Sequence, residues 1–324
     1  MCTSMTFKTK DNYFGRTLDI EYSFDEKIII TPKNYEFKLK NYNDFKTKYA
    51  FIGAATIIDG YPLYAEATNE KGLSIAGLNF PENAFYHPQE KDKINLATYE
   101  LIPWILGNFS SVEEVGYYLN DINITNEPFN VSTPASPLHW MLCDKNHCLV
   151  LEPMQQGLEI HFNPVGILTN NPPITYHLTN INNYINLTPD ICNNRFSTKI
   201  KLDTYSLGMG AIGLPGDNSS TSRFIRAAFN KLNSVSDLDE DSSVSQFFHI
   251  LDTVTIVKGT TMTKDKKWNA TTYSCCINID KGIYYYKTYN NNQITAIKLN
   301  SFNINNNQLT IYDLENTQQI KYLN

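Results

Sequence analysis

A cysteine stands at position 2, directly after the initiator methionine, and two charged residues, Arg16 and Asp19, follow within one short hairpin. If Met1 is removed, Cys2 carries both a thiol and a free α-amino group. An α-amino group has a pKa of about 7.7–8.0, so it can accept the thiol proton near neutral pH. This arrangement predicts a nucleophile with its own base at the start of the chain.

Arg16 and Asp19 fit the same chemistry. A nearby arginine favours the thiolate form of a cysteine, and an aspartate can hold an amino group by a charge-assisted hydrogen bond. The two positions differ by an odd number, so a regular strand would point them to opposite faces. We therefore expect the strand to bend or end near Leu18. The alternative interpretation is an unremarkable second residue with a surface ion pair.

The elements that must position these residues can be predicted from period and turn signals. Residues 2–8 and 13–20 alternate like two strands of a hairpin, with a turn at 10–12. We expect further strands at 49–58, 62–68 and 73–79, several within 137–170, and three after residue 270. Helices are predicted at 95–108, 173–185, 219–231 and 243–254, with another starting at a capping box of Ser110 and Glu113. Residues 188–218 read as a long, loop-rich connection.

This order, with strands at both ends and helices in two middle blocks, favours an α+β fold with mainly antiparallel sheets. The chain has 324 residues, of which 42% are hydrophobic and 19% charged, as in a folded protein. No Pro/Ser-rich linker divides it, so we expect one domain over residues 1–324.

Charge and hydropathy exclude several partners. The formal net charge of −6 provides no basic field for nucleic acid or an anionic membrane. The longest apolar stretch, 101–109, is too short to cross a membrane and contains Pro103. Lys8 and Lys10 interrupt any signal-peptide pattern. We expect a cytoplasmic protein whose six cysteines are mostly free thiols.

The chain contains other residues that could be reactive. Cys143, His147 and Cys148 could suggest a metal, but no second Cys/His pair is near in sequence, and a strand turn explains them better. Cys275 and Cys276 are adjacent in a predicted strand and read as buried thiols. A Cys–His dyad would need a histidine that nothing in the sequence selects. We expect no metal and no cofactor.

Several motifs, in order, resemble the choloylglycine hydrolase family, whose members include bile salt hydrolases and penicillin V acylases. They are "MCTS", "FGRTLDIEYSF", "NEKGLSIAGLNFP", "LHWML", "GILTNNP", "GLPGD", "SRFIRAAF" and "GIYYYKTYNNNQITAI". The resemblance runs from residue 2 to about residue 298. It implies an N-terminal nucleophile (Ntn) hydrolase fold, a four-layer αββα sandwich of two antiparallel sheets.

The resemblance also implies roles for individual residues. Cys2 matches the nucleophile, and Arg16 and Asp19 match the charged pair around its thiol and amine. For the oxyanion, the family pattern implies the backbone N–H of Asn79 and the side-chain amide of Asn170, with Asn171 the neighbouring alternative. Arg223 matches a second arginine near the nucleophile.

The implied activity is hydrolysis of the amide bond between a bile acid and glycine or taurine. Asn79 favours this substrate, because penicillin V acylases of the family tend to carry tyrosine there. The alternatives are a penicillin V or acyl-homoserine-lactone acylase with the same chemistry, and a catalytically silent bile-salt binder. Apolar loops at 20–24, 80–88 and 130–138 could form the pocket. The resemblance further implies a homotetramer.

Overall fold

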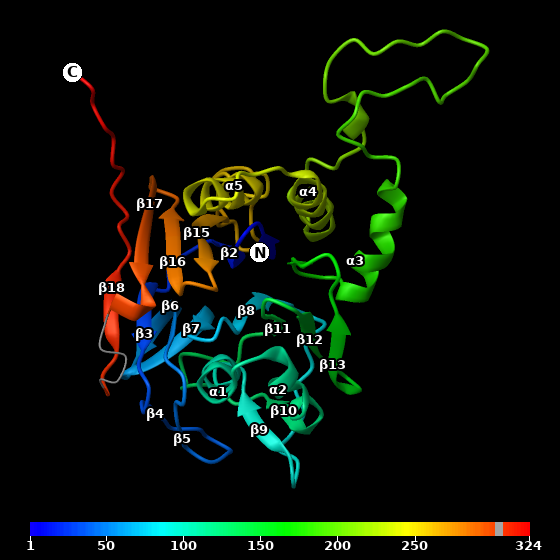
Figure 1. Ribbon diagram of the computed structural model, residues 1–324. Helices are drawn as coiled ribbons and strands as arrows, with labels where there is room; N and C mark the ends of the chain where they lie inside the picture. The colour runs from blue at the N-terminus through cyan, green and yellow to red at the C-terminus, as the bar shows by residue number, and fades with distance from the viewer. Residues whose placement is uncertain (302–306) are drawn as a thin grey trace.

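The computed structural model describes residues 1–301 and 307–324, without the side chain of residue 301. Two large antiparallel sheets form its centre (Figure 1). The first has the strand order β14-β1-β2-β15-β16-β17. Its strands are β1 (Cys2–Lys8), β2 (Asn12–Ile20), β14 (Ile167–Leu168), β15 (Ala270–Asn278), β16 (Ile283–Thr288) and β17 (Asn291–Lys298). Strand β1 is thus paired on both edges, which fixes the position of Cys2 at its first residue.

The second sheet has the order β13-β12-β11-β8-β7-β6-β3-β18. Its strands are β3 (Lys27–Thr31), β6 (Phe51–Ile58), β7 (Tyr61–Asn69), β8 (Ser74–Asn79), β11 (Leu138–Cys143), β12 (Cys148–Met154), β13 (Gly157–Phe162) and β18 (Thr310–Asp313). Two small sheets accompany it: antiparallel β4 (Glu36–Phe37) with β5 (Phe45–Lys46), and parallel β9 (Ile94–Ala97) with β10 (Ile122–Thr125).

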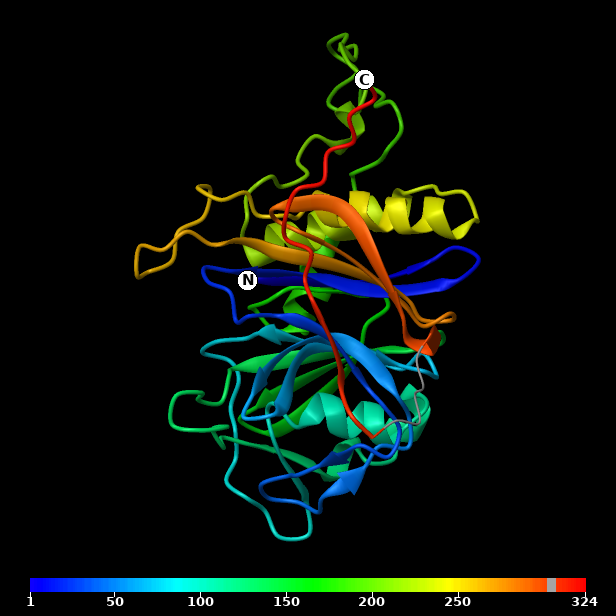
Figure 2. The ribbon, with the colours of Figure 1, turned by 90° about the vertical axis from the view of Figure 1, so that its left-hand side faces the viewer.

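Helices cover the outer face of each large sheet (Figures 1 and 2). The helices are α1 (Leu101–Asn108), α2 (Val112–Gly116), α3 (Ile174–Asn180), α4 (Ser220–Asn233) and α5 (Glu240–Asp252). Short 3₁₀ turns occur at Leu119–Asp121, Ile181–Tyr184, Met209–Ala211 and Leu299–Ser301. Helices α1 and α2 lie under the second sheet, and α4 and α5 lie over the first. The expected αββα sandwich is confirmed.

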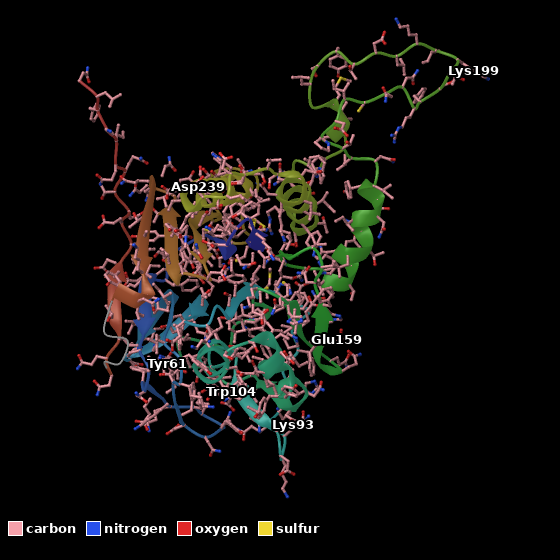
Figure 3. The ribbon with its side chains drawn as sticks, in the orientation of Figure 1. Tyr61, Lys93, Trp104, Glu159, Lys199 and Asp239 are labelled. Carbon is pink, nitrogen blue, oxygen red and sulfur yellow. The ribbon has the colours of Figure 1, made fainter. Side chains whose placement is uncertain are left out.

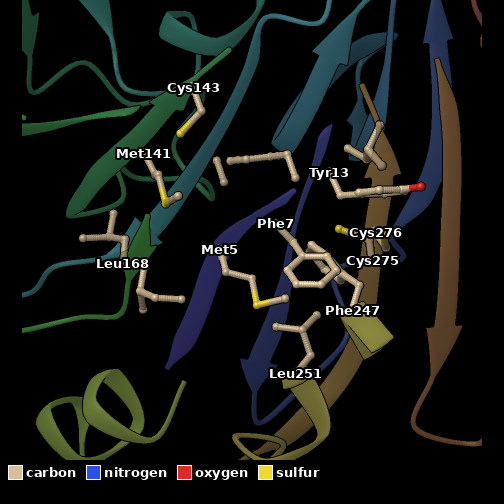
Figure 4. Close-up of a cluster of buried hydrophobic side chains, with 14 of the residues drawn as sticks. Met5, Phe7, Tyr13, Met141, Cys143, Leu168, Phe247, Leu251, Cys275 and Cys276 are labelled. Carbon is tan, nitrogen blue, oxygen red and sulfur yellow. The ribbon is translucent and has the colours of Figure 1, made fainter. Parts of the chain in front are cut away.

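Alternation along β11 shows how one strand serves two layers. Trp140 and Leu142 point into the apolar cluster beneath the second sheet, together with residues of α1. Met141 and Cys143 point the other way, into the cluster between the sheets (Figure 4). Successive side chains of a strand point to opposite faces, so a nearly continuous apolar run is required where both faces are covered.

Two local predictions are wrong. The helix predicted from residue 95 is strand β9 over its first part, because Ile94–Ala97 pairs with β10, and α1 begins only at Leu101. The cap of α2 lies one residue later than predicted: the Ser111 hydroxyl accepts from the Glu114 N–H. The Glu114 carboxylate accepts at 2.7 Å from the N–H of Ser110, the residue before the cap, so the second bond of a capping box is made one residue early.

The loop-rich segment is confirmed and leaves the body of the protein. Residues 185–212, called the arm below, project from the end of α3 and return to α4 (Figures 1 and 2). Lys199 lies near its tip (Figure 3). Large apolar side chains of the arm are exposed, among them Phe196 (82%), Tyr205 (86%) and Leu207 (87%).

Among the described residues, no helix has both the length and the apolar character needed to cross a membrane.

Candidate active site

Cys2 begins β1 between the two sheets and is 3% exposed. Its Cα lies opposite Leu18 of β2. Its backbone nitrogen donates to Asn170 Oδ1 at 2.9 Å, although the two residues are far apart in sequence. Met1 precedes it, and the terminal amino group of Met1 donates to the Asp19 carbonyl oxygen at 2.5 Å. Cys2 nitrogen is therefore a peptide N–H in this chain, already aimed at a fixed acceptor.

Asn170 links Cys2 to helix α4 and to strand β8. Its Oδ1 also accepts from Nη2 of Arg223 at 2.7 Å, and its Nδ2 donates to the Asn79 carbonyl oxygen at 2.7 Å. A peptide N–H and a guanidinium can only donate, so the orientation of the amide is determined. One Nδ2 hydrogen remains for another acceptor. The expected choice of Asn170 over Asn171 fits these contacts, because Asn171 Nδ2 instead donates to the Pro81 carbonyl.

The backbone of Asn79 also faces Asn170. The Phe80 N–H donates to the Pro137 carbonyl at 2.7 Å. Hydrogen-bonded and non-hydrogen-bonded residue pairs alternate along two antiparallel strands. The pair of Phe80 and Pro137 is hydrogen-bonded, so the next pair, Asn79 and Leu138, is not. The N–H and C=O of Asn79 therefore point away from β11. Strand β7 pairs with β8 only as far as Ala76 on that side. The Asn79 N–H therefore opens towards the same side as its carbonyl, where Asn170 lies.

Arg223 is fully buried in the first turns of α4. Its Nη1 donates to the Cys2 carbonyl oxygen and to Thr3 Oγ1, and its Nε donates to the Asn218 carbonyl at 3.0 Å. Burial lowers the pKa of its guanidinium, which the negative charge of Asp19 partly offsets. A guanidinium nevertheless stays protonated in proteins, so Arg223 holds a positive charge against the backbone of Cys2.

Arg16 is buried on the other side of Cys2. Its Nη1 donates to the carbonyls of Gly77, at 2.6 Å, and Ala65, at 3.2 Å. Its Nη2 has no hydrogen-bond partner within the described part of the chain. Burial acts to lower its pKa, but the attraction of Cys2, Tyr273 and Glu66 is stronger and raises it. The structure thus holds a fixed cation that has one open donor and interacts electrostatically with Cys2.

Glu66 is a site residue that the sequence analysis missed. It is fully buried and lies 3.8 Å from Nη1 of Arg16. It accepts from the hydroxyls of Tyr273 and Tyr284, each at 2.7 Å. Burial raises the pKa of its carboxyl, while Arg16 and the tyrosines act against this. The sequence does contain one signal for such a residue. If Arg16 is buried, it needs a buried residue of opposite charge.

Asp19 makes contacts different from those expected. Its carboxylate accepts from Thr17 Oγ1 at 3.0 Å and from Thr271 Oγ1 at 2.6 Å, while only its backbone carbonyl meets the terminal amino group. The expectation that the strand bends or ends near Leu18 is wrong: β2 continues to Ile20, and the register shift lies in the neighbouring strand β15, between Thr271 and Tyr273. Arg16 and Asp19 point to opposite faces of β2, as in a regular strand, and both are buried because the strand is covered on both faces.

Three further buried residues, His139, Glu152 and His177, contact the backbone around Asn170. They were not identified as a group from the sequence. The ring nitrogens of His139 lie 3.0 Å from Glu152 Oε1 and 3.0 Å from the Thr169 carbonyl. Glu152 also accepts from the Ile174 N–H. His177 Nε2 lies 3.1 Å from the Asn170 carbonyl. Together they fix the backbone on both sides of Asn170.

Of the other cysteines, Cys275 borders this site, with its Sγ 3.7 Å from Glu66 Oε1. Cys143 and Cys148 face a separate cavity beside Lys231, and Cys275 and Cys276 are buried on opposite faces of β15, as expected. The described residues contain no group of three or more His, Cys, Asp or Glu side chains suited to a metal ion.

Comparison with known proteins places these observations in a family. A family model described as linear amide C–N hydrolases, choloylglycine hydrolase family, matches residues 2–312. The bile salt hydrolase/transferase of Lactiplantibacillus plantarum is 48% identical over 324 residues, covering 100% of both chains. The bile salt hydrolase/transferase of Clostridium perfringens is 40% identical over 336 residues, again covering 100% of both.

Solved structures agree with the architecture. A crystal structure of a mutant conjugated bile acid hydrolase from Clostridium perfringens matches with a TM-score of 0.94 at 39% identity, covering 100% of both chains. The penicillin V acylase of Agrobacterium tumefaciens matches with a TM-score of 0.76 at 18% identity, covering 96% of this chain and 91% of that one. The second match shows a shared fold alone.

Proposed function

The chain belongs to the choloylglycine hydrolase family of linear amide C–N hydrolases, and we propose that it cleaves the amide bond between a bile acid and its glycine or taurine. The observation that carries this proposal is the convergence of Cys2, Asn79 and Asn170 on one point through the two Asn170 hydrogen bonds. The names of the most similar relatives supply the substrate class.

Cys2 is the proposed nucleophile once Met1 has been removed. Its nitrogen then becomes an α-amine that keeps the acceptor Asn170 Oδ1 at 2.9 Å. Arg16 and Arg223 place two positive charges around Cys2, and such charges attract an anionic sulfur nucleophile. We expect the amine to take the thiol proton, and the thiolate then attacks the amide carbon. Asp19 supports this arrangement by holding Thr17 and the backbone around the N-terminus.

The proposed oxyanion donors are the free hydrogen of Asn170 Nδ2 and the N–H of Asn79. Both face the same side of β8, and losing one such donor typically costs about 10²–10³ in rate. The protonated amine gives its proton to the departing nitrogen of glycine or taurine, which leaves a thioester on Cys2. Water, deprotonated by the same amine, then attacks the thioester and releases the bile acid.

The proposed steroid pocket lies where strands of both sheets end beside Cys2. Residues 20–24 follow Asp19 directly, and residues 130–138 lead to Leu138, opposite Asn79. Tyr22 and Phe24 stack edge to face at 4.7 Å and are 51% and 46% exposed. Apolar groups held open in this way suit a rigid steroid, whose burial stabilises the complex by roughly 25 cal/mol per Å².

The test is kcat/KM for glycocholate, taurocholate and penicillin V, measured side by side. We expect both bile salts to be preferred in the wild-type enzyme and all three activities to vanish in Cys2→Ala. Asn79→Tyr adds a ring at the pocket mouth and should shift the ratio towards the flat phenoxy group of penicillin V. If wild-type enzyme cleaves penicillin V at least as efficiently as either bile salt, the substrate proposal is wrong while the mechanism stands.

We further infer a homotetramer of single-domain subunits in the cytoplasm. The exposed apolar side chains of the arm support self-association. The layer of buried side chains between the two sheets supports one domain. All six cysteines are free thiols, which suits a reducing compartment.

A further inference from the structure

Cys143 and Cys148 form a thiol pair that the amidase chemistry does not use. They lie directly opposite each other at the ends of β11 and β12, with their sulfur atoms 2.7 Å apart. Figure 4 shows Cys143 at the edge of the cluster between the sheets. The two residues are 1% and 9% exposed.

The register of this hairpin suits a covalent bridge. The Asp144 N–H donates to the His147 carbonyl at 3.0 Å, so the next pair along, Cys143 with Cys148, is of the non-hydrogen-bonded kind. The Cys148 carbonyl agrees, since it accepts from Asn163 on the side of β13. Residues in such a pair have Cα atoms about 4.5 Å apart, within the range that a disulfide spans without backbone movement.

The same geometry disfavours a metal ion. Two thiolates bound to one tetrahedral zinc, at Zn–S distances of about 2.3 Å, would lie about 3.8 Å apart. The sulfur atoms are closer than that. His147, the third residue of the motif, is half-exposed on the turn with its Nδ1 3.7 Å from Asp144.

A cavity gives a small oxidant access to the pair. It measures about 240 Å³ and is lined by both cysteines, Thr6 and Lys231. Lys231 Nζ donates to Val165 O at 2.6 Å and to Thr6 Oγ1 at 3.0 Å, which holds its charge at the cavity wall. Such a volume admits molecules of the size of water. The Lys231 ammonium thus lies on the wall of the same cavity as both cysteines.

The two thiols differ in burial, and this difference indicates which of them attacks the oxidant first. Burial raises the pKa of Cys143 well above its usual value, and Cys148 adds to this effect. Cys143 therefore keeps its proton and donates it in a hydrogen bond to the sulfur of Cys148. Cys148 is the more exposed of the two and is the better placed to attack.

We propose that Cys143 and Cys148 are a second reactive site, a dithiol that hydrogen peroxide converts reversibly into an intramolecular disulfide. The Cys148 thiolate attacks one peroxide oxygen, the O–O bond breaks, and a sulfenic acid forms while hydroxide leaves and is protonated. The Cys143 sulfur then attacks the sulfenic sulfur, and the S–O bond breaks. The second hydroxide leaves as water with the Cys143 proton. Two thiols and one peroxide thus give one disulfide and two waters.

Peptide mapping of the folded protein tests the proposal without relying on activity, which peroxide also affects through Cys2. Trypsin cleaves after Lys145, between the two cysteines, so a bridge keeps the two flanking peptides joined. We expect joined peptides after brief peroxide treatment and separate peptides after dithiothreitol. Cys143→Ser should abolish the joined species and leave a sulfenic acid on Cys148 that dimedone labels. Cys276→Ser, which removes another buried thiol, is the matched control and should keep the joined peptides.

Two results would overturn the proposal. One is the absence of joined peptides at a peroxide exposure that oxidises Cys192, a partly exposed thiol on the arm. The other is a bridge that forms only when the protein is unfolded in urea. The wild-type measurement needs no substitution, so it holds even if a variant folds poorly.

Discussion

Cys2 can use its own nitrogen as a base only after Met1 is gone, because a peptide nitrogen has no basic lone pair. An uncleavable N-terminal tag should therefore lower kcat by about 10²–10⁴, the usual contribution of a general base. The thiol remains in place, since β1 is paired on both edges. Intact mass and release of glycine from glycocholate are measured on the same samples. Full activity in protein that retains Met1 would rule out the amine as the base.

Glu66 keeps Arg16 neutralised in the interior, and this role predicts a large loss of stability in Glu66→Gln. Removing one partner of a buried ion pair costs about 3–5 kcal/mol, because the other charge stays buried and unpaired. Glu70→Gln is the matched control. Its ion pair with Lys33 is shorter, at 2.9 Å, but partly exposed, and such pairs contribute about 0–1 kcal/mol. Urea unfolding of both variants gives the comparison. Similar losses would contradict the buried charge pair.

Among the larger elements, the segment 169–174 depends on a neutral histidine. His177 is fully buried, packs on Phe224 with ring centroids 4.7 Å apart, and faces the Asn170 carbonyl through Nε2. Burial lowers its pKa to about 4. Protonation would place a charge in this apolar contact.

The folded-state pKa of His177 is below the unfolded value of about 6.5, so the unfolded chain binds the proton more readily. The stabilisation is fully present above about pH 6.5 and is lost as pH falls through about 4, amounting to about 3 kcal/mol. Urea unfolding between pH 7 and 4 should show a steeper loss in wild type than in His177→Gln. His249→Gln, on the exposed face of α5, should keep the wild-type slope. Parallel slopes for wild type and His177→Gln would contradict this assignment.

The residues of the sequence motifs were easier to predict than the buried residues that contact them, such as Glu66. β-Bulges explain this difference. Strict alternation would put Glu66 on the face of Tyr64, under the helices. The register of β6 and β7 shifts between Ala54 and Ala55, which makes Ala65 an extra residue and turns Glu66 into the space between the sheets. The freed Ala65 carbonyl then accepts from Arg16. The two-residue alternation of a strand does not show where a bulge inserts one extra residue, so the sequence could not predict the face on which Glu66 lies.

The same limit applies to Asp19. The expected bend or end of β2 near Leu18 is wrong, because β2 continues to Ile20; the extra residue opposite it lies in β15, more than 250 positions away. Pairing partners this distant are set by the whole fold, and neither strand alone specifies them. The αββα sandwich was predictable because several motifs matched a family in order. Local pattern alone reached only the α+β class.

For the molecule as a whole, the arm is the element whose exposure in a single chain needs an explanation. It joins α3, which follows Asn170, to α4, which carries Arg223. Contacts of the arm with another subunit would therefore steady two elements of the site at once. Assembly of the proposed tetramer should therefore raise the rate of the reaction.

Replacing Phe196 and Leu207 by serine should dissociate the assembly, because burying such side chains contributes about 1.5–3 kcal/mol each. We expect wild type to sediment at four times the chain mass of 37.0 kDa, and the double variant at one or two times that mass, with an unchanged circular dichroism spectrum and a lower kcat. Leu232→Ser is the control, because Leu232 is 61% exposed on α4 and outside the arm, and it should leave the tetramer intact. Wild type that sediments as a single chain would refute both the tetramer and the function assigned to the arm.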